Sequence, residues 1–173
     1  MANMASDLRF RRAGTGDADV LQLLWERANA RRRGTAIPDF PDPQAVEELR
    51  DRLGLAGAVA VLAEDVEGPV ASCFATPLVG PGGEPVHGGA HLSGVAVAPG
   101  RWGQGLGDAI VAFAEQVLCD EGFGFVQLHV LQTNDRARTL YERRGWNLSR
   151  EGDLHPEGSQ AVYEKQLTQG PIQ

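Results

Sequence analysis

A glycine-rich turn follows the apolar segment Val95-Ala96-Val97 and runs Arg101-Trp102-Gly103-Gln104-Gly105-Leu106-Gly107. Its alternate glycines remove the side chains that would hold the backbone away from a ligand. A helical pattern begins near Leu106, and the free N–H groups and partial positive charge of a helix N-terminus attract phosphate. The turn therefore indicates a phosphate or pyrophosphate ligand, with a purely structural turn as the alternative.

Two common nucleotide loops fit this turn poorly. A Walker A loop needs lysine followed by serine or threonine after its last glycine, whereas Gly107 leads into Asp108 and Ala109. The dinucleotide fingerprint Gly-x-Gly-x-x-Gly differs from these evenly spaced glycines, and it follows a parallel strand. A nucleotide-binding protein stays open as an alternative, and it predicts binding of ADP or NAD.

The elements around the turn are predicted from hydrophobic periodicity. Apolar residues recur at helical spacing from Leu106 and predict an amphipathic helix that ends near Gly122. The β-prone segment Phe125 to Leu131 predicts the next strand. If the strands before and after this helix are parallel neighbours, a right-handed crossover places the turn at the carboxyl edge of the sheet, where open α/β sheets bind ligands.

The chain before the turn predicts two helices and a meander of antiparallel strands. The first helix is expected over 17–32 and the second from the cap Asp42-Pro43 to Leu53. Strands are expected over 58–63 and 70–79, followed by a Gly/Pro loop over 80–89. The inner stripe expected for the first helix is Val20, Leu21, Leu24, Trp25 and Ala28.

The chain after Leu131 predicts one helix and a final pair of strands. The helix is expected over 135–144, with Ala137, Leu140 and Tyr141 facing inward and Gly145 just past its end. The strands are expected over 146–150 and 160–167, joined by a loop over 151–159.

Composition limits the class of protein. The 173 residues are 42% hydrophobic and 23% charged, which predicts one domain over 1–173, with loose tails at 1–6 and 168–173. A net charge of −7 disfavours a nucleic-acid partner. The sequence shows no secretory signal and no apolar run of about 18 residues, so we expect a cytoplasmic protein with no membrane partner. Cys73 and Cys119 form no metal-ligand motif and are expected to pack as small apolar residues.

Two motifs in order resemble the GNAT superfamily of acyl-CoA-dependent N-acyltransferases, and the resemblance spans Leu8 to Leu167. The first family signature, (Gln or Arg)-x-x-Gly-x-(Gly or Ala), falls on Trp102 to Gly107, with Trp102 in place of the usual arginine or glutamine. This departure removes one possible polar contact with phosphate. The second signature matches Asn134, Ala137, Leu140-Tyr141 and Gly145-Trp146.

The resemblance implies a mixed α/β fold: a central, mostly antiparallel, twisted sheet with a splayed parallel strand pair, flanked by about four helices. It also implies acetyl-CoA, or a related acyl-CoA, as co-substrate. The pyrophosphate would lie on the amides from Gly103 to Asp108 and the pantetheine beside Val95 and Val97. The cofactor-binding residues so implied are Val95, Ala96, Val97, Trp102, Gly103, Gln104, Gly105, Leu106, Gly107, Asp108, Asn134 and Tyr141.

Acyl transfer to an amine needs an acid for the leaving thiolate, a base for the amine and a donor for the oxyanion. Tyr141 matches the family tyrosine whose hydroxyl faces the CoA sulfur, and ordinary helix packing is its alternative role. Asn134 resembles the residue that contacts the CoA arm, and it also stands where a helix N-cap belongs. The resemblance implies main-chain N–H groups near Val95 as the oxyanion donors.

His91 is the candidate base, because it stands where some family members carry a carboxylate and its ordinary pKa of about 6.5 suits proton transfer near neutrality. A structural role is its alternative. His129 faces opposite to Leu128 and Val130 and is interpreted as structural. The chemistry requires no metal.

The acceptor is expected to be a primary amine of a small molecule or a protein. The family binds it with segments that correspond here to 31–41 and 151–159, and the second carries Glu151, Asp153 and Glu157. These acidic groups would attract a cationic amine, or they would only be solvated. A non-catalytic acyl-CoA sensor or partner module of the same fold is the alternative function, and a homodimer is possible.

Overall fold

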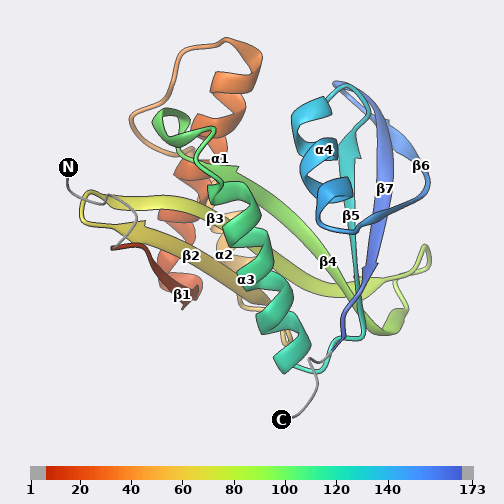
Figure 1. The fold of residues 1–173 in the computed structure, drawn as a ribbon. Coiled ribbons are helices and arrows are strands. Elements are labelled where there is room, and N and C mark those ends of the chain that lie inside the picture. Colours follow the sequence, from red (N-terminus) through yellow and green to blue (C-terminus); the bar gives the residue numbers. More distant parts are fainter. Residues whose placement is uncertain (1–6, 169–173) are drawn as a thin grey trace. The chain divides into compact units, whose positions relative to one another are not determined.

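The computed structural model describes residues 7–168, which form seven strands and four α helices. Figure 1 shows these elements coloured along the chain. The tails predicted to be loose, 1–6 and 168–173, lie outside these residues apart from Thr168. Two short 3₁₀ helices, η1 (Thr15–Asp17) and η2 (Pro99–Arg101), precede α1 and α3. The longer elements are β1 (Arg9–Ala13), α1 (Ala18–Arg33), α2 (Pro43–Leu53), β2 (Val59–Asp65), β3 (Gly68–Val79), β4 (Pro85–Val97), α3 (Leu106–Asp120), β5 (Phe125–Leu131), α4 (Asp135–Arg143), β6 (Asn147–His155) and β7 (Gly158–Gln166).

The strands are hydrogen-bonded in the order β1-β2-β3-β4-β5-β7-β6. β1 pairs with β2, β2 with β3, β5 with β7 and β6 with β7, all antiparallel. β4 and β5 are parallel, and their ladder joins Gly89–His91 to Phe125–Gln127. The predicted fold class, a mostly antiparallel mixed sheet with one parallel pair and four helices, is therefore confirmed.

Internal contacts divide the chain into two compact units. The first comprises Met1–Thr76 and Gly94–Ala114, and the second comprises Pro77–Ser93 and Glu115–Gln173. The sequence prediction of one domain over the whole chain stays a prediction.

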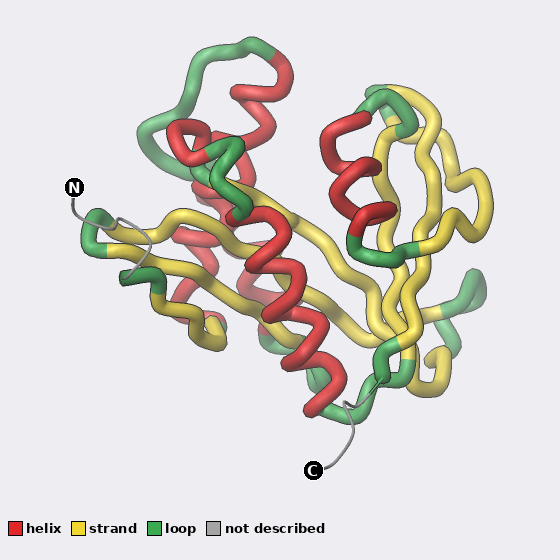
Figure 2. Tube along the Cα trace, in the orientation of Figure 1, coloured by secondary structure: helices red, strands yellow, loops and turns green. Residues whose placement is uncertain are grey.

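The first unit buries its strands on both faces. Residues 59–63 of β2 are all buried, a pattern typical of a strand between two layers. The α1 and α2 helices cover one face, where their apolar residues pack with Phe74 of β3. On α3, Phe113 contacts Phe10 of β1, with ring centroids 5.6 Å apart. Figure 2 shows these strands with helices on either side.

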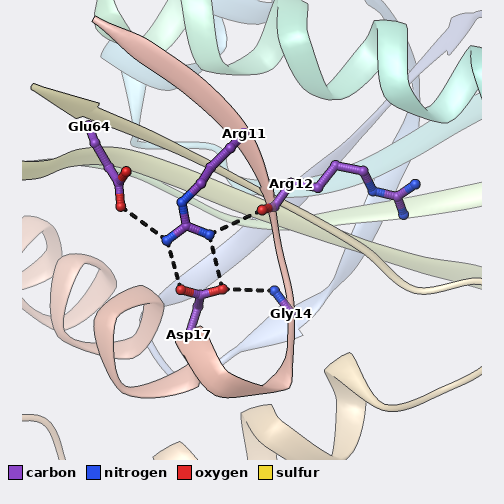
Figure 3. Close-up of polar contacts among 5 residues, drawn as sticks. All are labelled: Arg11, Arg12, Gly14, Asp17 and Glu64. Atoms are coloured by element: carbon purple, nitrogen blue, oxygen red, sulfur yellow. Dashed lines mark hydrogen bonds and ion pairs between the residues drawn. The ribbon is translucent and has the colours of Figure 1, made fainter.

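A cluster of charged groups connects β1, the start of α1 and β2 in the first unit (Figure 3). One guanidinium nitrogen of Arg11, Nη2, donates to Asp17 at 2.8 Å and to Glu64 at 3.0 Å. Asp17 also accepts the backbone N–H of Gly14 at 2.9 Å. The hydrogen bonds from Arg11 hold the pKa of Asp17 below its usual range. The cluster fixes the turn by which the chain leaves β1 and enters α1.

Two predicted helix starts are confirmed. The side chain of Asp42 accepts the N–H of Gln44 at 3.0 Å, with Pro43 at the first helical position of α2. The side chain of Asn134 accepts the N–H of Ala137 at 3.3 Å at the start of α4. Both caps satisfy an amide that has no partner within its helix.

The second unit packs α4 against the sheet formed by β5 and β7. Val126, Leu128 and Val130 of β5 are buried, as the alternation of the strand predicts. The buried carboxylate of Glu115, near the end of α3, forms ion pairs with Arg144 and, at 2.6 Å, with the Nζ of Lys165 on β7. The same Lys165 Nζ donates to the backbone carbonyl of Arg144 at 2.6 Å. These contacts fix the chain where it leaves α4.

Two predicted loops are largely strand. β4 begins at Pro85, so the second half of the loop predicted over 80–89 is paired. β6 continues to His155 and β7 begins at Gly158, so the loop predicted over 151–159 is the end of a hairpin. Shifts in the register of β6 accommodate Gly152, where an added Cβ would lie 3.1 Å from the Cβ of Gln160. The polar residues there reflect the exposure of a hairpin at the edge of the sheet, and not an absence of pairing.

The inner stripe predicted for the first helix is wrong at Trp25, which is 38% exposed. Ala18, Leu21 and Leu24 are buried in α1. Trp25 lies at the margin of the core, where its ring is 3.7 Å from the position that a Cβ on Gly94 would occupy. Helical spacing predicts the face of the helix but not where the core ends.

Candidate active site

The glycine-rich turn in the first unit has the backbone conformation that its sequence predicts. Gly103 and Gly105 have φ angles of 82° and 78°, in the left-handed region that residues with a side chain rarely adopt. A Cβ added at either glycine would meet nothing within 4 Å. The glycines are therefore required by backbone conformation rather than by crowding, and the turn is open on its outer side.

The turn ends at the N-terminus of α3. The carbonyl of Gly105 accepts the N–H of Ala109 at 3.1 Å and begins the helical hydrogen-bond pattern. Amides in the first turn of a helix have no acceptor within the helix, so those that follow Gly105 suit an anion. Gly107 lies within α3, so the third glycine of the motif belongs to the helix and not to the loop.

Trp102 occupies the signature position at which the family carries arginine or glutamine. Its indole Nε1 donates to the carbonyl of Val97 at 2.9 Å. The guanidinium carbon of Arg31, in the last turn of α1, lies 5.2 Å from the centroid of the Trp102 ring. The indole Nε1 of Trp102 thus bonds to β4, and Arg31 of α1 contacts the face of the ring.

The neighbouring Arg101 is engaged elsewhere. Its guanidinium forms an ion pair with Asp65 of β2, and its Nε donates to the side chain of Gln104 at 2.8 Å. The hydrogen bond from Arg101 lowers the pKa of Asp65. Arg101 therefore fixes the turn on β2, and its charge is balanced by a carboxylate.

The strand segment before the turn alternates as a half-buried strand should. Ala96 is buried in the core of the first unit, whereas Val95 and Val97 are partly exposed. Gly94 has a φ of 63°, and a Cβ there would lie 2.9 Å from the ring of Phe74. Gly94 directly precedes Val95, near which the resemblance implies the main-chain oxyanion donors.

In the second unit, Tyr141 lies in an aromatic cluster. Only 6% of Tyr141 is exposed, and its ring lies 5.5 Å from that of Trp146 and 6.3 Å from that of Tyr163. The cluster fixes the ring by packing. It fits both the predicted acid, held in one orientation, and the packing alternative.

A hydrogen-bond network that shares Tyr163 with this cluster fixes α4 on β7. The hydroxyl of Tyr163 donates to Glu142 at 2.7 Å and accepts from the Nε of Arg138 at 3.0 Å. Burial raises the pKa of Tyr163. Arg138 also donates to the carbonyl of Gln132 at 3.0 Å. The network therefore joins α4, which carries Tyr141, to β7 and to the segment before the helix.

His91 contacts His129, with ring centroids 5.3 Å apart and ring planes nearly perpendicular. His91 is also paired with Gln127 in the parallel ladder, and the side chain of Gln127 donates to Glu164 at 3.0 Å. In the sequence the two histidines are far apart, and each has its own predicted role. Their contact could have been predicted, because each histidine lies on one of the two strands that were expected to be parallel neighbours.

The predicted site residues are divided between the units. The first unit contains the turn with its cofactor-binding residues, and the second contains His91, Asn134 and Tyr141. The roles assigned to these residues stay predictions. Sequence reasoning missed Arg31, Asp65 and His129 as neighbours of the predicted residues. For Arg31, the unusual Trp102 was the signal that another contact was needed.

The described chain is thus an α/β protein with a mixed sheet that has one parallel pair, and its glycine turn leads into the N-terminus of α3, an arrangement suited to an anion. The family model for the acetyltransferase (GNAT) family matches residues 20–146. The chain belongs to this family, and the resemblance found in its sequence is confirmed.

Known structures agree in fold. The ribosomal-protein-S18-alanine N-acetyltransferase from Escherichia coli is 19% identical with a TM-score of 0.70, and the alignment covers 95% of this chain and 96% of that one. The yncA protein from Salmonella typhimurium, a putative acetyltransferase solved with its cofactor acetyl-CoA, is 15% identical with a TM-score of 0.71, covering 96% and 98%. A putative phosphinothricin N-acetyltransferase is 16% identical with a TM-score of 0.74, covering 94% and 99%. A comparison with curated protein sequences gave no significant match.

Among residues 7–168, no helix combines the length and the apolar character that a membrane crossing requires.

Proposed function

We propose that the protein transfers an acetyl group from acetyl-CoA to a primary amine of a small molecule or protein, by direct attack in a ternary complex. Membership of the acetyltransferase (GNAT) family supports acyl transfer, and one structural neighbour was solved with acetyl-CoA. The observation that carries the proposal is the turn at Gly103 and Gly105, whose left-handed glycines lead into the start of α3.

The reaction forms a C–N bond and breaks the C–S bond of the thioester. The neutral amine nitrogen attacks the carbonyl carbon, and main-chain N–H groups near Val95 donate to the developing oxyanion. The amine loses one proton to His91, directly or through water, and the departing thiolate gains one from the hydroxyl of Tyr141. Holding both substrates together lowers the entropic part of the barrier.

The cofactor would be held mainly by backbone. Its pyrophosphate would lie on the amides from Gly103 to Asp108, and its pantetheine beside Val95 and Val97. The partial exposure of these two valines supports this arrangement, whereas the burial of Ala96 leaves only its backbone for contact. Asn134 already caps α4 through its side-chain oxygen, so its amide nitrogen is the group proposed to contact the CoA arm.

Calorimetric titration with acetyl-CoA tests the proposal, with CoA, ADP and NAD as comparisons. Binding of acetyl-CoA and CoA well above that of ADP and NAD supports it. Absence of binding, or equal binding of all four, contradicts it and favours a nucleotide-binding protein or a structural turn.

A non-catalytic acyl-CoA-binding module is the second candidate function. The burial of Tyr141 among Trp146 and Tyr163 is compatible with it, because this packing alone would account for the tyrosine. A screen of primary amines, read by the release of free CoA thiol, separates the two. Turnover with any amine supports the enzyme, and tight acetyl-CoA binding without turnover across polyamines, aminoglycosides and peptide amines supports the module.

A further inference from the structure

We propose that Arg31 binds a phosphate of the CoA cofactor and so replaces, from another part of the chain, the arginine or glutamine that the family signature carries at position 102. This inference rests on the proposed function, because it assigns a residue to the cofactor site. All the residues involved belong to the first unit.

The departure at position 102 removes a polar side chain from the phosphate-binding turn. The indole of Trp102 offers one donor, Nε1, and that donor is already bonded to the carbonyl of Val97. Trp102 therefore has no side-chain donor left for an anion. A positive charge at this part of the turn must therefore come from a neighbouring side chain.

Arg31 is the neighbour that the contacts identify. Its guanidinium lies over the face of Trp102, 5.2 Å from the ring centroid, and Trp102 immediately precedes Gly103 of the turn. A ring face attracts the cation but leaves the N–H donors of the guanidinium available at its edge. Arg31 forms no ion pair with a carboxylate among residues 7–168. Within the described part of the chain, Arg31 thus presents beside the turn a charge that no carboxylate balances.

The other arginine beside the turn differs on this point. Arg101 forms its ion pair with Asp65 and donates to Gln104, so an anion would have to compete with a carboxylate for its charge. The two arginines therefore have different roles. Arg101 fixes the turn, whereas Arg31, oriented by the Trp102 ring, remains available to the ligand.

The test is calorimetric titration of CoA into the wild-type protein and into Arg31→Gln, with Arg32→Gln as the matched control. Arg32 stands next to Arg31 at the same helix end, but its guanidinium donates to the side chain of Asn29. Loss of one charge-assisted phosphate contact should raise the Kd of Arg31→Gln about tenfold. Arg32→Gln should change the Kd for CoA less than about twofold, because the solution screens an exposed charge that does not contact the ligand. Arg31→Lys should recover part of the loss.

A double variant moves the arginine from position 31 to position 102. The double variant Arg31→Gln with Trp102→Arg returns the signature residue and should bind CoA within about twofold of the wild type. Equal effects of Arg31→Gln and Arg32→Gln would overturn the proposal, because only net charge would matter. So would an unchanged Kd for CoA with a raised KM for the amine, which would place Arg31 at the acceptor. Absence of CoA binding by the wild type would instead contradict the proposed function itself.

Discussion

The two units carry their predicted site residues by different means. The first presents backbone: two left-handed glycines, Gly103 and Gly105, and the start of α3. The second presents side chains, because Tyr141 is held by the rings of Trp146 and Tyr163 and His91 contacts His129. A backbone site depends on a few conformations within one segment. A side-chain site depends on packing between segments distant in the sequence, so substitutions should disturb the two parts differently.

A β-branched residue at position 105 is the most severe test of the backbone part. We expect Gly105→Val to abolish CoA binding, a loss of at least about a thousandfold, because valine at a φ of 78° is strained and its side chain would obstruct the neighbouring amides. Gly100→Ala is the control, since Gly100 lacks a positive φ and an added Cβ there has open space. Both variants would be measured by calorimetry, and wild-type affinity in Gly105→Val would remove the amides as the phosphate site.

The two clustered tyrosines provide the corresponding test of the side-chain part. Tyr141→Phe should lower kcat about a hundredfold, because the thiolate loses its proton donor, and should leave the Kd for CoA unchanged. Tyr163→Phe is the control. It removes the hydroxyl bonded to Glu142 and Arg138, so it should lower stability by about 1 kcal/mol and leave kcat within about threefold. Equal kcat in Tyr141→Phe and wild type would assign Tyr141 to packing.

The buried ion pairs of the second unit should matter more to stability than exposed ones. Glu115→Gln leaves the charges of Arg144 and Lys165 without their carboxylate, and we expect a loss of about 2 kcal/mol in the free energy of unfolding. Glu47→Gln removes an exposed pair with Arg50 on α2 and should cost less than about 0.5 kcal/mol. Urea unfolding of both variants measures the difference. Equal losses would mean that burial of Glu115 adds nothing to its ion pairs.

The half-exposed cluster of the first unit should give the smallest effect, and it should depend on pH. Arg11 lowers the pKa of Asp17 in the folded state, so the stabilisation is complete above the unfolded pKa of about 3.9 and is lost as pH falls through the folded value. Asp17→Asn should therefore cost about 1 kcal/mol at pH 7, with the difference from wild type vanishing at low pH. Asp19→Asn is the control on the same helix. Denaturant unfolding between pH 7 and pH 3 measures both, and a difference independent of pH would contradict the assignment.

Much of the fold could be predicted because the signals were local. β5 was predicted with its observed bounds, and the caps Asp42 and Asn134 are where the sequence indicated. The turn was predicted because glycine requirements depend on the backbone of a few consecutive residues. In the β6–β7 hairpin the local signal was misleading, because the exposed pairs around Gly152 have the composition of a loop.

The contacts around the candidate site could not be predicted in the same way. Arg31 is the end of one helix and Trp102 belongs to a distant turn, and no periodicity joins them. Glu115 fits a polar position on α3, and its partners Arg144 and Lys165 come from later segments. Such pairs are set by the tertiary structure, which brings together residues whose local sequences carry no information about each other.

The stacking of Arg31 on Trp102 has an evolutionary consequence. An arginine introduced at position 102 alone would place two like charges side by side, and loss of Arg31 alone would leave the indole without its cation. The two positions should therefore change together during divergence. Among relatives, an arginine or glutamine at the position of Trp102 should accompany the absence of arginine at the position of Arg31.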